Sequence, residues 1–404
     1  MSFPRKIRVL VVDDSAIVRK VLTDVLSSQP DIEVVGTAPD PYVARDKIVA
    51  LQPDVLTLDV EMPRMDGLTF LDRLMAAHPM PVVVISSLTQ RSAQAALEAV
   101  HRGAVDVMAK PGGPYSVGDL KEQLPGRIRA AAAAKVQRGA AALPSAIKAA
   151  SSPLAALPHP PQAPPVSRSG DAPHPSNAGS SKGPASGASD PGPWRRDRVI
   201  LIGASTGGTQ AIEQILRNLP AGLPPILATQ HIPAGFSAAF AERLNGCCAM
   251  RVSEARDGEP AVSGHAYVAP GNWHMLLEQT RDAGYCVRLH DGPKLHYQRP
   301  AVDELFSSGA RVAGKTAIGV LLTGMGKDGA QGMLSLRTAG AMTIAQDEAT
   351  CVVFGMPHEA ISLGAAQRVL GLNEIAPALL ELVRLSPAVT ELAGTGARRT
   401  GSQS

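Results

Sequence analysis

A proline-rich segment divides the chain into two parts. Residues 144 to 193 contain 12 prolines in 50 residues, mixed mainly with alanine, serine and glycine. Such a composition has almost no large apolar side chains, so burial cannot offset the entropy lost on ordering the backbone. A structureless stretch of this length is uncommon inside a compact domain. We therefore predict a disordered linker between two separately folded regions of the 404-residue chain.

The region before the linker alternates apolar runs with segments of helical periodicity. The run IRVLVVDD precedes AIVRKVLTDVLSS, in which Ile17, Val21 and Leu22 recur at helical spacing, and five such strand–helix pairs follow one another. This alternation indicates βαβ units, a parallel sheet and right-handed crossovers. Helices then cover both faces of the sheet, which explains why the predicted strands are unbroken apolar runs.

The region after the linker shows the same alternation of apolar runs and helical patterns. The clearest strand–helix pairs are RVILIGAS with TQAIEQILRNL, PILATQHI with AFAERLN, and TAIGVLLTG with AQGMLSLRTAG. The segments HAYVAPG and YCVRLHD are predicted to be strands with polar turns. The sequence therefore predicts an α/β protein with two doubly wound parallel-sheet domains.

Composition excludes several classes of protein. The formal net charge is only +3, with 39 Lys and Arg against 36 Asp and Glu, so we expect no nucleic-acid partner. No run of 18 apolar residues occurs, so we expect no membrane insertion, and we interpret the start MSFPRKIRVLVVDDS as a first strand and not a signal peptide. The cysteines show neither metal-ligand spacing nor a disulfide framework, which predicts a reducing cytoplasm. They are Cys247, Cys248, Cys286 and Cys351.

Polar residues stand at the ends of the strands in the first region. Asp13 and Asp14 follow the first strand, Asp59 the third, Ser86 the fourth and Lys110 the fifth. Strand ends of a parallel sheet meet at one edge, where three carboxylates repel each other unless a cation lies among them. Oxygen ligands suit Mg²⁺, and a carboxylate beside Mg²⁺, a hydroxyl and an ammonium group is a suitable phosphoryl acceptor. Taken alone, the adjacent aspartates are better explained as a helix N-cap region, but polar residues at the ends of successive strands argue against that explanation.

The motifs around these positions resemble a known family. DVEMPRMDG at Asp59 and KPGG at Lys110 are similar to the receiver domain of bacterial response regulators, over residues 5 to about 125. The resemblance implies a flavodoxin-like fold with Asp59 as the phosphorylated residue. It also implies that Asp13 and Asp14, with Asp59, hold Mg²⁺, that Ser86 and Lys110 read the phosphorylated state, and that a sensor histidine kinase is the phosphodonor.

The second region contains a glycine-rich turn with a central serine. Gly203-Ala204-Ser205-Thr206-Gly207-Gly208 lies between a predicted strand and a predicted helix. Its GxSxG core in this context is typical of a nucleophile elbow, which presents serine at the sheet edge beside a helix N-terminus. The rival interpretation is a phosphate-binding glycine loop, although GxGxxG order and GK[ST] are absent. The motif alone leaves both open.

A nucleophilic serine needs a base, and position suggests one. His231 ends the predicted strand PILATQH, so we expect it at the same sheet edge as Ser205. His274 and His358 follow Trp273 and Pro357 and are more typical of structural or pocket residues. Position alone does not decide the assignment of His231.

A triad also needs a carboxylate that orients the imidazole. The predicted strand TAIGVLLT leads into GMGKDG, which places Asp328 at the sheet edge. An N-cap role is the simpler alternative for Asp328, and Asp303 and Asp347 are weaker candidates for the carboxylate. Backbone N–H groups near Met325, or in the turn that begins at Thr206, are candidates for an oxyanion hole.

Six motifs in this order resemble the bacterial chemotaxis protein-glutamate methylesterases, over about residues 197 to 385. They are GASTGG, QHIPAGF, VAPGNWH, RPAVDELF, LLTGMGKDGA and AQDEATCVVFGMP. The resemblance implies a Rossmann-like three-layer domain without a cofactor in the esterase site, and a triad of Ser205, His231 and Asp328. The implied substrates are glutamyl methyl esters, and often glutamines, of methyl-accepting chemoreceptors. The linker looks longer and richer in proline than expected of the family.

These observations predict a receiver domain at 5–125, a helix end and linker at 126–196, a methylesterase domain at 197–388 and a tail at 389–404. We expect a phosphorylation-activated serine esterase whose receiver domain covers the active-site edge when unphosphorylated. The alternative is a phosphorylation-gated receptor-binding module without catalysis. A DNA-binding regulator would need a helix-turn-helix after the linker, which the sequence lacks.

Overall fold

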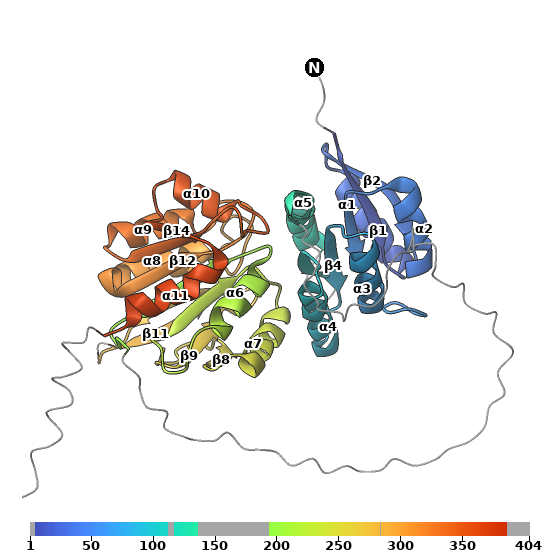
Figure 1. Cartoon of the computed structure of the whole chain (residues 1–404). Coiled ribbons are helices and arrows are strands. Elements are labelled where there is room, and N and C mark those ends of the chain that lie inside the picture. Colours follow the sequence, from blue (N-terminus) through green and yellow to red (C-terminus); the bar gives the residue numbers. More distant parts are fainter. Residues whose placement is uncertain (1–4, 112–116, 136–193, 283, 386–404) are drawn as a thin grey trace, which may run out of the picture.

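The structure is a computed structural model that describes residues 5–111, 117–135, 194–282 and 284–385. The predicted linker at 144–193 and the predicted tail at 389–404 lie outside these residues. The described residues form two α/β units, drawn in blue to teal and in green to red in Figure 1.

The first unit is a five-stranded parallel sheet between helices, with strand order β2-β1-β3-β4-β5. This is the flavodoxin-like order, and it confirms the predicted fold. The strands are β1 (Ile7–Val12), β2 (Ile32–Ala38), β3 (Val55–Leu58), β4 (Val82–Ser86) and β5 (Asp106–Ala109). The helices are α1 (Ala16–Ser27), α2 (Pro41–Leu51), α3 (Gly67–Ala77), α4 (Gln90–His101) and α5 (Val117–Ala133).

Short polar side chains start the helices of this unit. Asp66 precedes α3 and accepts a hydrogen bond from the Thr69 N–H, and Thr89 precedes α4 and accepts one from the Ser92 N–H. Such caps satisfy N–H groups that have no partner inside the helix. The strand order reverses between β1 and β3, so the loops after these strands open a crevice at the carboxyl edge.

The second unit is built on a seven-stranded parallel sheet with order β14-β13-β12-β6-β7-β9-β8. Its strands are β6 (Val199–Ala204), β7 (Ile226–Gln230), β8 (Arg251–Glu254), β9 (His265–Val268), β12 (Ala317–Leu321), β13 (Met342–Gln346) and β14 (Arg368–Leu370). Its α-helices are α6 (Gly208–Arg217), α7 (Phe236–Cys247), α8 (Val302–Val312), α9 (Ala330–Thr338), α10 (Met356–Ser362) and α11 (Leu372–Val383).

Two predicted strands of this unit have different roles. HAYVAPG contributes β9 to the main sheet, as expected of a strand. YCVRLHD contributes β11 (Tyr285–His290), which leaves the main sheet and pairs antiparallel with β10 (His274–Gln279). This hairpin packs against α8. The fold thus adds a small antiparallel element that the alternation of strands and helices does not predict.

The strand order of the seven-stranded sheet reverses at its central strand, β6. From β6 the sheet extends through β7 on one side and through β12 on the other. A crevice therefore opens at the carboxyl ends of β6, β7 and β12. A side chain at Gly203 in β6 would place Cβ 2.2 Å from Cγ1 of Val302, so glycine permits the close approach of α8.

The two units contact each other through helices. Figure 1 shows α4 and α5 of the first unit facing the second, where α4 packs against α7. Arg243 of α7 pairs with Glu98 of α4 at 3.2 Å, and Lys294 pairs with Asp119 of α5 at 2.5 Å. Among the helices in the described part of the chain, none is long and apolar enough to cross a membrane.

Candidate active site

Ser205 lies in a tight turn between β6 and α6. Its N–H donates to the Thr323 carbonyl at 3.0 Å, and its carbonyl accepts from the Gly208 N–H at 2.7 Å. Gly207 adopts φ of 79°, a left-handed conformation that glycine reaches without strain. The turn thus places Ser205 at the carboxyl end of a central strand and at the start of a helix, as a nucleophile elbow requires.

A second loop, residues 323 to 326, meets this turn. The Thr323 hydroxyl donates to the Thr206 carbonyl at 2.9 Å. A Cβ at Gly324 would lie 2.7 Å from the Ser205 Cβ, so only glycine allows this approach. Within the described residues, neither the Thr206 nor the Met325 N–H donates a hydrogen bond. Both predicted oxyanion donors are therefore N–H groups without an acceptor, one in the residue after Ser205 and the other in the loop that meets its turn.

His231 follows β7, the neighbour of β6. Its N–H donates to the Ala204 carbonyl at 3.1 Å, which sets it beside Ser205 at the sheet edge. Its imidazole Nε2 lies 2.7 Å from Oδ2 of Asp328, and only 2% of each side chain is exposed. The structure contains no Ser205–His231 hydrogen bond within its described ranges. Because Nε2 faces the carboxylate, Nδ1 is the imidazole nitrogen left for a hydroxyl.

Asp328 is held as an anion by the start of α8. Its Oδ2 accepts from the Val302 N–H at 2.7 Å, and its Oδ1 accepts from the Asp303 N–H at 2.9 Å. Burial alone would raise the pKa of Asp328, but the hydrogen bond and charge of His231, with these two N–H groups, hold it below its ordinary value. Asp328 is thus an ionised carboxylate that can stabilise an imidazolium.

The alternative histidines have other partners. His274 is fully buried, with Nε2 donating to the Pro293 carbonyl at 2.9 Å and Nδ1 accepting from the Ala301 N–H at 3.2 Å. Both its nitrogens are therefore used in fixing the segment that leads into α8. His358 is exposed and stacks edge-on against Phe354. Neither of these two contacts the Ser205 turn.

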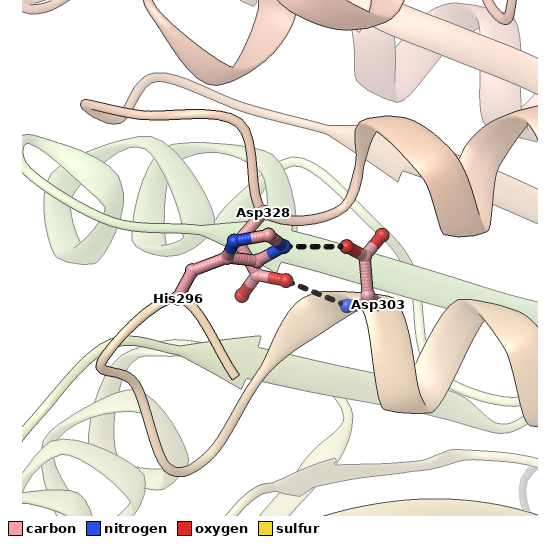
Figure 2. Close-up of side chains that lie close together, drawn as sticks. All are labelled: His296, Asp303 and Asp328. Carbon is pink, nitrogen blue, oxygen red and sulfur yellow. Dashed lines mark hydrogen bonds and ion pairs between the residues drawn. The ribbon is translucent and has the colours of Figure 1, made fainter. Parts of the chain in front are cut away.

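The alternative carboxylates also differ from Asp328. Asp347 accepts hydrogen bonds from the N–H and the hydroxyl of Thr350, at 2.9 and 2.6 Å, and so closes a turn. Asp303 lies next to Asp328 and faces His296, as Figure 2 shows. Sequence reasoning missed His296, because its place in a loop gives no periodic signal and only the tertiary fold brings it to α8.

The acidic residues of the first unit come together as predicted from their strand ends. Asp13, Asp14 and Asp59 each offer an oxygen, and these atoms lie within 4.8 Å of one another. Lys110 Nζ lies 2.7 Å from Oδ2 of Asp59 and 2.9 Å from Oδ2 of Asp13. Even so, burial raises the pKa of Asp59 to about 6. One ammonium group does not balance three carboxylates, and this all-oxygen set fits Mg²⁺.

Ser86 points toward α4 and not toward Asp59. Its buried hydroxyl donates to the Ser92 carbonyl at 3.3 Å. A network that sequence reasoning missed lies beside it, since Glu61 accepts from the Ser92 hydroxyl at 2.6 Å and from the Ser87 hydroxyl at 2.8 Å. These hydrogen bonds, the one from Ser92 first, hold the pKa of Glu61 below its ordinary value. The loop after Asp59 is thus tied to the start of α4.

A buried ion pair of the first unit reaches the Ser205 turn. Arg127 of α5 pairs with Asp106 of β5 at 2.6 Å, and 6% and 7% of these side chains are exposed. The same Asp106 oxygen accepts from the Thr206 hydroxyl at 2.7 Å, while Arg127 donates to the His231 carbonyl at 3.1 Å. Sequence reasoning missed this contact, because it depends on how the two units pack.

Comparisons with known proteins agree with this organisation. A family model described as response regulator receiver domain matches residues 9–120, and one described as CheB methylesterase matches residues 200–379. A protein-glutamate methylesterase/protein-glutamine glutaminase of Syntrophus aciditrophicus is 48% identical over 378 residues, covering 94% of this chain and 99% of the relative. One of Salmonella typhimurium is 46% identical over 386 residues, covering 95% and 99%.

Solved structures include the catalytic domain of a CheB methylesterase from Thermotoga maritima. It is 39% identical, with 46% of this chain and 98% of that one covered and a TM-score of 0.45. The curated relatives decide the family, because identity near one half extends over nearly all of both chains. This chain therefore belongs to the protein-glutamate methylesterase/protein-glutamine glutaminase family, with a receiver domain followed by a CheB methylesterase domain.

Proposed function

We propose that this chain is a phosphorylation-activated serine esterase that hydrolyses glutamyl methyl esters of methyl-accepting chemoreceptors in the cytoplasm. The observation that carries the proposal is the buried His231–Asp328 pair, 2.7 Å apart, at the sheet edge where the Ser205 turn lies. Family membership favours this activity over a binding module without catalysis.

The first half of the reaction forms an acyl-enzyme. The Ser205 Oγ attacks the ester carbonyl of the receptor glutamate, and His231 takes the hydroxyl proton on Nδ1. His231 then gives this proton to the departing methoxy oxygen, so methanol leaves and an ester to Ser205 remains. Asp328 bound to Nε2 orients the ring and stabilises the imidazolium formed between these steps.

The oxyanion of the tetrahedral intermediate needs donors that are already in place. The N–H group of Thr206, the residue after Ser205, and that of Met325, in the loop that meets this turn, have no acceptor among the described residues. The N-terminus of α6 adds its positive dipole end at the same turn. We assign these two N–H groups to the oxyanion, where loss of one donor costs about 100- to 1,000-fold in kcat.

The second half of the reaction hydrolyses the acyl-enzyme and regenerates Ser205. Water, deprotonated by His231, attacks the acyl carbon, and the proton passes to Ser205 as its ester bond breaks and the glutamate is released. The same steps convert a receptor glutamine into glutamate, with ammonia in place of methanol as the leaving group. Deamidation is therefore the second activity that we propose.

The receiver domain supplies control of this site. A sensor histidine kinase donates the phosphoryl group to Asp59. Asp13, Asp14 and Asp59 would hold Mg²⁺, which would neutralise charge on the transferred group. Lys110 already contacts Asp59 at 2.7 Å. To reach a phosphoryl oxygen, the Ser86 hydroxyl must leave the Ser92 carbonyl, which would loosen the start of α4.

Before phosphorylation, the receiver domain restrains the catalytic edge. Asp106 and Arg127 bind the Thr206 hydroxyl and the His231 carbonyl, and α4 packs on α7. A change at α4 on phosphorylation would weaken this packing and release the contacts near Ser205. Phosphorylation then acts by shifting the population toward an open site.

Methanol release from methylated chemoreceptor membranes tests the activity. The full chain with Mg²⁺ and a small acyl phosphate should release methanol, and Ser205→Ala should not. Asp59→Asn should retain basal release and lose the stimulation. Binding to the receptor without methanol release in the unmodified chain would establish the binding module instead.

A further inference from the structure

A second imidazole–carboxylate pair lies directly behind Asp328. Figure 2 shows His296, Asp303 and Asp328 together, and one ligand atom of each lies within 4.8 Å of the others. His296 Nε2 is 3.2 Å from Oδ2 of Asp303. The exposed part of the side chain falls from 36% for His296 to 13% for Asp303 and 2% for Asp328. A line of titratable groups thus runs from the surface to His231.

Asp303 contacts Asp328 in two ways. Its backbone N–H donates to Oδ1 of Asp328 at 2.9 Å, and its own carboxylate lies alongside. That carboxylate is fixed by the Gly332 N–H of α9, which donates to Oδ1 of Asp303 at 2.7 Å. Burial first, and the charge of Asp328 second, raise the pKa of Asp303, whereas the hydrogen bonds from Gly332 and His296 oppose this.

The loop that carries His296 is built to hold it in place. Arg299 donates to the carbonyls of Asp291 and Gly292 at 2.5 and 2.9 Å, and to Oδ1 of Asn272 at 2.8 Å. His296 and Tyr297 adopt φ of 49° and 63°, left-handed conformations that cost about 1–3 kcal/mol each and persist only where the surroundings fix them. The position of His296 is therefore determined by its loop.

From this arrangement we propose that Asp303 and His296 are positioning residues for the hydrolytic reaction, a proposal that rests on the function assigned above. The Asp303 carboxylate adds negative charge behind Asp328, which strengthens His231 as a base and stabilises its imidazolium. His296 donates to Asp303 and so keeps that carboxylate turned toward Asp328. Neither residue touches the substrate in this role.

The other charged groups near His231 do not replace Asp303. Arg127 and Asp106 approach from the receiver domain, where Arg127 binds the backbone carbonyl of His231 and Asp106 binds Thr206. Asp328 and Asp303 are thus the carboxylates on the imidazole side within the described residues, and His296 is the group that faces Asp303 from the loop.

A divalent metal would suit the same spacing, but the hydrogen bonding argues against it. Both oxygens of Asp328 accept hydrogen bonds, from His231, Val302 and Asp303. Both oxygens of Asp303 also have partners, in Gly332 and His296. A metal would have to displace several of these donors, so we interpret the cluster as a hydrogen-bonded pair behind the triad.

The pH profile of the full chain tests this role. Methanol release from methylated receptor membranes is measured against pH with Mg²⁺ and a small acyl phosphate present. Asp303→Asn keeps the shape of the side chain and removes its charge, so the His231 imidazolium formed during catalysis should be less stabilised. The acid limb of kcat/KM should then move to lower pH by about half to one unit. The plateau kcat should fall about 3- to 30-fold with KM within twofold, because a weaker base remains.

Two further variants complete the experiment. His296→Ala should lower kcat about 2- to 10-fold with KM retained, because Asp303 loses its donor. Glu304→Gln is the matched control, since Glu304 is the next residue of α8 and lies 3.9 Å from another imidazole, that of His290. It should leave both kcat and the acid limb unchanged.

Three outcomes would overturn the proposal. One is an Asp303→Asn profile that superimposes on that of the unmodified chain. Another is a uniform loss of activity in Asp303→Asn without movement of the acid limb, which a purely structural role would produce. The third is activity that rises with added Zn²⁺ in the unmodified chain but not in His296→Ala, which would make the cluster a metal site. The unmodified chain and Ser205→Ala, assayed alongside, separate these outcomes from failure of the proposed esterase. That failure would leave the unmodified chain without methanol release, or would leave Ser205→Ala as active as the unmodified chain.

Discussion

At the scale of single residues, a different structural feature positions each member of the candidate triad. Ser205 depends on a turn that two loops build, His231 on a strand end, and Asp328 on hydrogen bonds from the first residues of α8. Replacing Asp328 by asparagine keeps one oxygen acceptor for these N–H groups but removes the charge that stabilises the imidazolium. Loss of Ser205 instead removes the nucleophilic oxygen, and loss of His231 removes the nitrogen that accepts its proton.

This difference gives the first prediction. Ser205→Ala and His231→Ala should each lower kcat for methanol release by about 1,000-fold or more, because members of one catalytic unit fail together. Asp328→Asn should lose somewhat less. Near-normal activity in His231→Ala would show that the base is misassigned.

The second prediction concerns a histidine outside the site. Burial, assisted by the charge of Arg251, lowers the pKa of His265 to about 4, from an ordinary value of 6.5. Between these values the unfolded chain binds a proton that the folded chain does not. The free energy of unfolding should therefore fall as pH falls from 6.5 to 4, by up to about 3 kcal/mol.

His265→Gln should flatten this dependence. Urea unfolding followed by tryptophan fluorescence at pH 7 and at pH 4.5 measures it, because both tryptophans, Trp194 and Trp273, lie in the second unit. His358→Gln, at an exposed position, serves as the control. Equal slopes for His265→Gln and the unmodified chain would contradict the assignment of the acid sensitivity to this residue.

The sequence predicts residues well where strand ends alone position them. Asp13, Asp59, Lys110, Ser205 and His231 all follow strands, and a parallel sheet brings such residues to one edge. Residues that meet by helix packing could not be predicted in this way. His296 reaches Asp303 only because a loop folds onto α8, and Asp106 reaches Thr206 only because two units pack together.

At the scale of elements, the start of α8 connects the core to the site. Val302 packs over Gly203 of β6, and its N–H binds Asp328. The helix can approach this strand only because residue 203 has no side chain. Displacement of α8 would therefore separate Asp328 from its donors.

The third prediction follows from this packing. Gly203→Ala should destabilise the second unit by about 1–3 kcal/mol, since overpacking forces neighbouring atoms to move. It should also lower kcat more than the loss of stability explains. Gly246→Ala in α7 is the control, because a Cβ there meets nothing within 4 Å. Urea unfolding and methanol release are measured for both variants. Equal stability and equal activity of Gly203→Ala and Gly246→Ala would contradict the prediction.

Element prediction succeeded for the buried strands of both sheets and for β11, and it missed β8, β10 and β14. The strand VILIGA within the run RVILIGAS is buried along its whole length, so the pattern is unambiguous. By contrast, β8 and β14 are short edge strands with exposed residues, and β10 forms a two-stranded sheet with β11. The exposed residues of β8 and β14 interrupt the apolar run, and β10 joins β11 with no helix between them, so the alternation of strands and helices does not reveal these three strands.

At the scale of the whole molecule, one buried pair joins the two units near Ser205. Arg127 contacts Asp106 within the receiver and the His231 carbonyl across the interface. Removing Arg127 would leave Asp106 buried with the Thr206 hydroxyl as its remaining side-chain donor, an arrangement that costs several kcal/mol. The closed arrangement, in which the receiver contacts the catalytic domain at Thr206 and His231, should be destabilised more than the open one, because water can reach Asp106 in the open one.

The fourth prediction is that Arg127→Ala raises basal activity. Methanol release without phosphodonor should increase about 3- to 30-fold, which corresponds to roughly 0.7–2 kcal/mol of lost stabilisation of the closed arrangement, and stimulation by a small acyl phosphate should shrink. Arg129→Ala is the matched control, because Arg129 lies on the same helix and pairs with Asp31 inside the receiver. Unchanged basal release in Arg127→Ala would show that this pair does not restrain the site.

The same pair limits how freely receivers can be exchanged between proteins. Asp106 begins β5 and Arg127 lies within α5, so both belong to the receiver while their outer contacts belong to the catalytic domain. A chimera that joins a foreign receiver to this catalytic domain would accept phosphate at its own aspartate. It would nevertheless fail to silence the esterase unless it also carried an aspartate and an arginine at these two positions.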